Sequence, residues 1–114
     1  MKRVLVVEDE PAIRALISAS LQGSDCQVAS VSDGRAALRA LQEARPDLVL
    51  LDLGLPGLSG AEVLRRLRAD TATAAIPIVL LTGREPPEDA AADAVLLKPF
   101  TPATLRRSLA GWLT

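Results

Sequence analysis

The chain has 114 residues and a formal net charge of −1, from 13 basic and 14 acidic side chains, with no histidine and one cysteine. A chain without histidine contains neither a Ser-His-Asp triad nor a histidine-ligated zinc site, and a lone cysteine forms no internal disulfide, which fits a reducing compartment. The near-neutral charge predicts no direct binding of nucleic acid. The apolar run at 4–7 is too short for a membrane span, so we expect a single cytoplasmic domain with no membrane partner.

Short apolar runs alternate with helical patterns along the chain. Continuous apolar runs, and one more mixed run that suits a sheet edge, predict strands at 3–8, 26–31, 47–52, 77–82 and 94–97. Apolar residues on one helical face, with proline or a capping residue at several of the starts, predict helices at 11–22, 34–44, 60–69 and 102–113. This alternation predicts an α/β fold, a doubly wound parallel sheet of five strands with helices on both faces.

Four of the predicted strands end in residues suited to phosphate and cation chemistry. Glu8 and Asp9 end the first strand, Asp52 the third, Thr82 the fourth, and Lys98 follows the fifth. Ligands of such sheets bind beyond these carboxyl ends. Clustered carboxylates repel one another, Mg²⁺ relieves the repulsion, and a lysine and a hydroxyl orient phosphoryl oxygens. Each residue alone also suits an ordinary turn or surface position, but their conjunction predicts a phosphoryl-transfer site.

Four motifs in the chain resemble those of the receiver domains of two-component response regulators. They lie at 6–11, 46–60, 81–83 and 98–100. The resemblance extends from the first predicted strand to the last predicted helix. It implies one receiver domain over residues 1–114 and a flavodoxin-like sheet with strand order 2-1-3-4-5.

The resemblance also implies a role for each carboxylate at the strand ends. Asp52 is expected to accept a phosphoryl group from a sensor histidine kinase or a phosphotransfer protein. Asp9, and Glu8 more indirectly, are expected to form the Mg²⁺ site. Asp52 and the carbonyl of Gly54 would complete the protein ligands of that cation.

Further positions of the family pattern surround the expected phosphoryl group. Thr82 resembles the hydroxyl that moves to the phosphoryl group, and Lys98 resembles the lysine that pairs with it. A cis peptide bond before Pro99 is typical of the family. Gly54 and Arg84 flank the site and are expected to influence the lifetime of the phosphoryl group.

Val95 departs from the family pattern. It stands three residues before Lys98, where the family usually has a Tyr or Phe ring that turns inward when the threonine moves. Valine has no ring, and its χ1 is stiff. Two interpretations stay open: Val95 is an ordinary strand residue beside an intact switch, or this strand does not relay the signal.

The segment between Thr82 and Lys98 is a second departure. It is shorter than in the family by about six residues, which is roughly one and a half helical turns. It also contains Pro86 and Pro87, which do not suit a helix interior. We expect the helix before the last strand to be at most one or two turns from about Glu88, or to be absent.

The expected function is a phosphorylation-dependent signalling switch. We expect no enzyme activity beyond self-catalysed, Mg²⁺-dependent phosphorylation and dephosphorylation. One alternative is a degenerate receiver that binds a partner protein without phosphorylation. A small phosphohydrolase is disfavoured, because such enzymes usually carry a second Asp two residues after the nucleophile, where this chain has Gly54. The sequence names neither the kinase nor the effector, which is a separate protein or a missing output domain.

Overall fold

The computed structural model describes residues 1–113. Its strands are β1 (Lys2–Val7), β2 (Cys26–Val31), β3 (Leu48–Asp52), β4 (Ile78–Thr82) and β5 (Ala94–Leu97), and its helices are α1 (Pro11–Leu21), α2 (Gly34–Glu43), α3 (Gly60–Ala69) and α4 (Pro102–Leu113). All five strands are parallel, in the order β2-β1-β3-β4-β5. The predicted fold class and strand order are therefore confirmed, and element ends differ from the expected ones by at most one residue.

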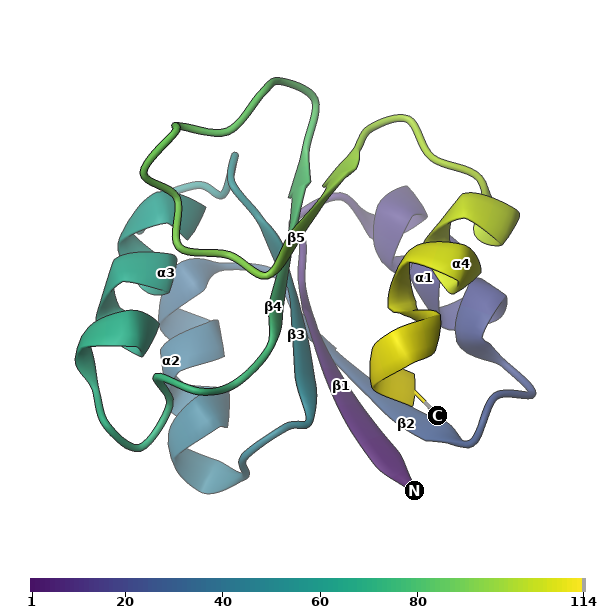
Figure 1. Ribbon diagram of the computed structural model, residues 1–114, viewed down its shortest axis with the longest axis horizontal. Helices are drawn as coiled ribbons and strands as arrows, with labels where there is room; N and C mark the ends of the chain where they lie inside the picture. The colour runs from purple at the N-terminus through teal and green to yellow at the C-terminus, as the bar shows by residue number, and fades with distance from the viewer. Residues whose placement is uncertain (114) are drawn as a thin grey trace.

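The sheet separates two hydrophobic cores (Figure 1). Helices α1 and α4 lie on one side of the sheet, and α2 and α3 lie on the other. Successive strand residues point to opposite faces, so Val4 and Val6 enter the first core while Leu5 and Val7 enter the second. Strands β3 and β4 are buried at all five positions each, as their continuous apolar runs predict. None of the described helices is long and apolar enough to cross a membrane.

Capping contacts set the start of α3. The Ser59 hydroxyl accepts the Glu62 N–H at 3.2 Å, which satisfies one of the free donors of the first turn. The Glu62 carboxylate makes no return contact with the Ser59 N–H. It pairs instead with Arg65 at 2.6 Å and with Arg66 at 3.1 Å. The Ser59 side chain therefore caps α3, without the reciprocal contact from Glu62 that would complete a capping box.

Residues 83–93 connect β4 to β5 without forming a helix, as the shortened and proline-containing segment predicts. One consequence is visible on β5, whose side chains alternate between the two faces of the sheet. Leu96 enters the core beside α4. Val95 and Leu97 point to the opposite face, where they are 41% and 53% exposed because no helix of the described chain covers them.

Arg68 holds this connecting segment in place from α3. Its guanidinium pairs with the Asp93 carboxylate at 2.8 Å, and the same carboxylate oxygen accepts the Ile78 N–H at 2.8 Å. The guanidinium also donates to three main-chain carbonyls, those of Ala74, Ile76 and Ala91. Long-range contacts of one side chain therefore fix the end of a segment that has no secondary structure of its own.

We expect Arg68→Met to destabilise the protein by about 2 kcal/mol, because it leaves several carbonyls and a carboxylate without their charged donor. Urea unfolding measures the loss, and hydrogen exchange should show faster exchange at residues 88–93. Arg65→Met is the control, since Arg65 only pairs with Glu62 on the surface of the same helix, and its cost should stay below about 0.5 kcal/mol. Equal effects of the two substitutions would contradict this role of Arg68.

Candidate functional site

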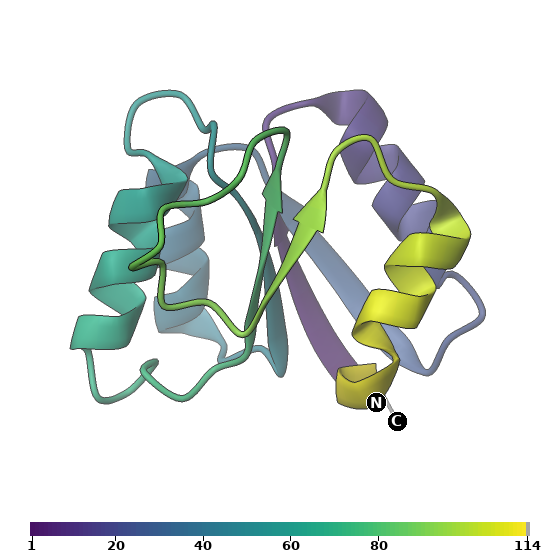
Figure 2. The same cartoon turned by 45° about the horizontal axis from the view of Figure 1, so that its top comes forward.

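The carboxyl ends of the central strands and of β5 meet at one edge of the sheet, the edge toward which the arrowheads of β4 and β5 point in Figure 2. They surround a cleft of about 570 Å³. Asp9, Asp52, Thr82 and Lys98 line this cleft, and Glu8 lies beside them, completely buried. The structure thus brings together the side chains that the sequence places at separate strand ends.

Three carboxylates form the acidic part of the cleft. Oxygen atoms of Glu8, Asp9 and Asp52 all lie within 4.8 Å of one another. Burial raises the pKa of the Glu8 carboxyl above its ordinary value, although the Lys98 ammonium acts in the opposite direction. Hard oxygen ligands held this close together suit a divalent cation such as Mg²⁺. The residues present therefore fit the cation that the family resemblance implies.

Lys98 supplies the compensating positive charge. Its Nζ lies 2.6 Å from Oε1 of Glu8 and 3.4 Å from Oδ1 of Asp52. Among residues 1–113 no hydrogen bond is assigned to this buried Oε1, but Coulomb attraction does not depend on hydrogen-bond alignment, so the contact is an ion pair. Burial acts to lower the pKa of Lys98, the two carboxylates raise it, and the net direction is upward. The peptide bond between Lys98 and Pro99 is cis, as the family pattern predicts.

Asp52 has one constrained and one available carboxylate oxygen. It is the last residue of β3 and is 4% exposed. Its Oδ1 accepts the Gly54 N–H at 3.0 Å and faces Lys98. Over residues 1–113 no hydrogen-bond donor is assigned to its Oδ2. A buried carboxylate with an oriented side chain and one unused oxygen is well placed to act as a nucleophile.

The Thr82 hydroxyl is engaged by the main chain of the following turn. It donates to the Arg84 carbonyl at 2.9 Å and accepts the Arg84 N–H at 3.1 Å. Thr82 is 7% exposed, and Gly54 and Arg84 line the same cleft. Val95, at the position where the family usually has an aromatic ring, belongs to neither hydrophobic core and is exposed.

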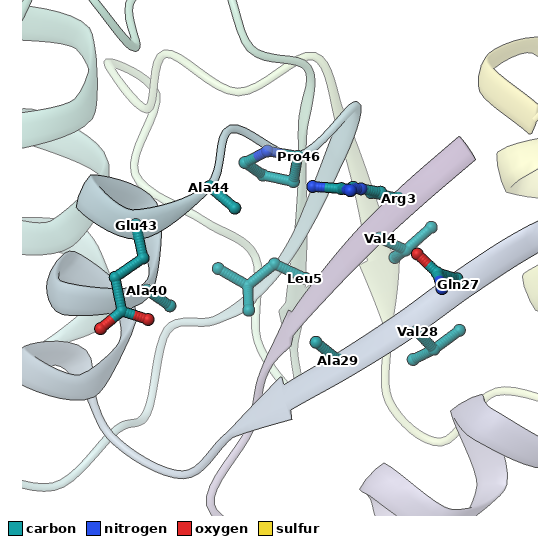
Figure 3. A pocket seen from close by; sticks show the side chains of 10 residues that line it. All are labelled: Arg3, Val4, Leu5, Gln27, Val28, Ala29, Ala40, Glu43, Ala44 and Pro46. Atoms are coloured by element: carbon teal, nitrogen blue, oxygen red, sulfur yellow. The ribbon is translucent and has the colours of Figure 1, made fainter. Parts of the chain in front are cut away.

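A second hollow of about 490 Å³ lies near the amino ends of β1 and β2, beside α2 (Figure 3). Its wall is largely apolar, with Leu5 and Ala40 among the lining residues and the charged side chains of Arg3 and Glu43 present as well. Among the described residues, Arg3 and Glu43 form no ion pair with each other, and this hollow has no counterpart of the three-carboxylate cluster at the strand ends. The two hollows are similar in volume, so the convergence of titratable groups, and not size, makes the cleft at the strand ends the candidate site.

The family model described as the response regulator receiver domain matches residues 4–110. The chain therefore belongs to the receiver domains of response regulators, and the resemblance seen in its motifs is confirmed. Among solved structures, the chemotaxis response regulator CheY4 of Vibrio cholerae is similar at a TM-score of 0.90 and 34% identity, with 99% of each chain covered.

Another similar structure bears on the cation. It is the receiver domain of a sensor histidine kinase from Pseudomonas aeruginosa PAO1, described with a magnesium ion coordinated in the active site cleft. It has a TM-score of 0.88 and 34% identity and covers 98% of this chain and 97% of its own. That receiver domain thus holds Mg²⁺ in its active site cleft, and the cluster of Glu8, Asp9 and Asp52 fits a site of this kind.

Curated relatives correct one prediction from the sequence. The DNA-binding response regulator MtrA of Mycolicibacterium smegmatis is 43% identical over 91% of this chain, and the phosphate regulon transcriptional regulatory protein PhoB of Escherichia coli is 39% identical over the same share. The chain spans about half of these relatives, 47% and 48%. The prediction of no nucleic-acid binding was wrong, because the charge balance describes only this shared part and does not exclude a DNA-binding output.

Proposed function

We propose that this receiver domain is a phosphorylation-dependent switch whose phosphoryl acceptor is Asp52. The observation that carries the proposal is the convergence on Asp52 of two further carboxylates and the Lys98 ammonium at the ends of separate strands. Turn residues that serve only local structure have no reason to converge from distant parts of a chain. The charge pattern suits an anionic phosphoryl group only when a cation is also held there.

Glu8, Asp9 and Asp52, together with the Gly54 carbonyl, would hold this cation. Mg²⁺ bound there would offset the repulsion between the carboxylates and the incoming phosphoryl oxygens. Oδ2 of Asp52, to which no hydrogen-bond donor is assigned among residues 1–113, is then available to react. It attacks phosphorus, and the bond from phosphorus to the leaving group of the donor breaks.

The phosphoryl donor would be a phosphohistidine of a partner protein. The chain has no histidine, so that donor comes from a histidine kinase or a phosphotransfer protein. Attack by Asp52 breaks the P–N bond, the bonding electrons leave with the imidazole nitrogen, and that nitrogen takes a proton from water. Lys98 would bind an oxygen of the phosphoryl group. The domain would thus catalyse its own phosphorylation and would not turn over a separate substrate.

The phosphoryl group would act as a switch through Thr82. It adds roughly −1.5 to −2 charges and new acceptor oxygens. The Thr82 hydroxyl then exchanges the Arg84 carbonyl for a phosphoryl oxygen, which releases the turn that follows β4. Where this domain stands in a longer protein like MtrA, we propose that the released surface regulates a DNA-binding output.

The valine at position 95 limits how far we expect the conformational change at Thr82 to extend into β5. We expect beryllofluoride, a phosphoryl mimic, added with Mg²⁺ to shift the amide resonances of Thr82 to Arg84 and to leave those of Ala94 to Leu97 nearly unchanged. The reason is that Val95 has no ring to follow the threonine. Two-dimensional NMR measures the shifts, and large shifts along the whole of β5 would contradict the prediction.

Incubation with acetyl phosphate and Mg²⁺ tests the proposed function directly. Intact-mass spectrometry should show the mass increase of one phosphoryl group. No such increase should appear when the incubation contains a chelator in place of Mg²⁺. A degenerate receiver, the alternative that the sequence left open, would take up no label. The assembled site does not favour that alternative, because each side chain that the chemistry needs is in place.

A further inference from the structure

The turn between β1 and α1, which carries Glu8 and Asp9, has few hydrogen-bond donors of its own. Pro11 begins the helix and has no N–H. Glu10 precedes it and makes no capping hydrogen bond with its side chain. The Glu10 N–H is used by the Glu8 carboxylate, at 3.1 Å. The carbonyls of the turn therefore need a donor from elsewhere in the structure.

Arg14 of α1 provides that donor. Its Nη1 donates to the carbonyl oxygen of Glu8 at 2.8 Å and to that of Asp9 at 3.0 Å. The Arg14 main-chain N–H bonds to the Glu10 carbonyl at 3.1 Å, so the arginine is anchored in the helix. Two consecutive carbonyls held by one half-buried guanidinium fix the peptide planes on both sides of Asp9. Those planes set the directions in which the acidic side chains leave the main chain.

We propose that Arg14 is a positioning residue for the cation site. It holds the turn after β1 so that the carboxylates of Glu8 and Asp9 converge with that of Asp52. The inference rests on the proposed function, since it concerns the affinity of the same cleft for Mg²⁺. Arg14 donates only to main-chain oxygens, so it acts through the acidic residues and not on the cation.

The charge and the geometry of Arg14 have opposite effects on cation affinity. A positive charge near the carboxylates repels Mg²⁺, so removing the charge alone would tighten binding. Losing the alignment of the ligands weakens binding, because partners that orient metal ligands typically contribute about 10–100-fold to affinity. The direction of the change therefore separates positioning from a purely electrostatic effect.

Titration calorimetry with MgCl₂ on the wild-type chain and on Arg14→Met, Arg14→Lys and Arg106→Met tests the proposal. We expect Arg14→Met to weaken Mg²⁺ binding about tenfold. Arg14→Lys keeps the charge on a shorter side chain that reaches the two carbonyls less well, so its affinity should fall between those of Arg14→Met and wild type. Arg106→Met is the matched control, because Arg106 of α4 also donates to a carbonyl, that of Ser20 at 3.5 Å, and its affinity should equal that of wild type.

Binding by Arg14→Met that is as tight as wild type, or tighter, would overturn the positioning role and leave the proposed function intact. If Arg14→Met does not fold, as judged by its amide spectrum, Arg14→Lys decides by the same criterion. A wild-type chain that binds no Mg²⁺ in this titration would remove the proposed function, and the positioning role with it. A loss of thermal stability in Arg14→Met at unchanged Mg²⁺ affinity would make Arg14 a structural residue only.

Discussion

Asp52→Asn should abolish the uptake of a phosphoryl group from acetyl phosphate. The asparagine amide oxygen carries no full negative charge and is a poor nucleophile, so the acceptor chemistry is lost. The two side chains have nearly the same shape, and the amide oxygen still accepts the Gly54 N–H. The fold should therefore be retained while labelling, measured by intact-mass spectrometry in the presence of Mg²⁺, disappears.

Asp47→Asn is the matched control for this substitution. Asp47 immediately precedes β3 at the end opposite Asp52, and its carboxylate accepts the Arg3 N–H at 2.8 Å. An asparagine there keeps an acceptor oxygen, so the control should be labelled like wild type. Undiminished labelling of Asp52→Asn would show that another side chain accepts the phosphoryl group.

Gly60→Ala should be the most destabilising small substitution near the site, with a cost of about 2–3 kcal/mol. A Cβ at Gly60 would overlap the carbonyl oxygen of Asp52 and would lie 2.7 Å from the Cα of Leu53. Both are main-chain atoms, which cannot move aside without shifting the end of β3. The start of α3 is therefore packed directly against the backbone of the proposed acceptor. Urea unfolding measures the stability, and phosphoryl labelling measures the effect on the site.

Gly111→Ala is the corresponding control in α4. An added Cβ there meets no atom within 4 Å, and alanine is the better helix former by about 1 kcal/mol. We expect this variant to be as stable as wild type or slightly more so. A Gly60→Ala protein that matches it in stability would show that α3 can move away from β3 at little cost.

The fold was largely predictable from local patterns. The apolar runs of β3 and β4 are long enough to be buried on both faces, and α3 and α4 start at the residues that their capping and proline signals indicate. Parallel strands direct their carboxyl ends to one edge, so the meeting of Glu8, Asp52 and Lys98 also followed from the order of elements. The absence of a helix between β4 and β5 in the described chain followed from the length of that segment and its two prolines.

Contacts made by long side chains were not predictable in the same way. No periodicity indicates that Lys98 lies closer to Glu8 than to Asp52, because that choice depends on three-dimensional packing at the end of β1. The arginines at positions 14 and 68 bind main-chain carbonyls, which every residue carries, so their partners leave no trace in the sequence. For Arg14 the only available signal is an arginine near a helix start that lacks a capping side chain. This combination is common in proteins and indicates no particular partner.

The connection between β4 and β5 has a practical consequence for protein engineering. Its two ends are held, by the Thr82 hydroxyl at Arg84 and by Arg68 at Ala91 and Asp93, while the residues between are mostly exposed. Doubling the length of such a loop costs only about 0.6 kcal/mol in closure entropy. A short peptide tag placed at Glu88 should be tolerated. An environment-sensitive fluorophore at the same position should be tolerated too, and under the proposed function its emission would change when Asp52 is phosphorylated.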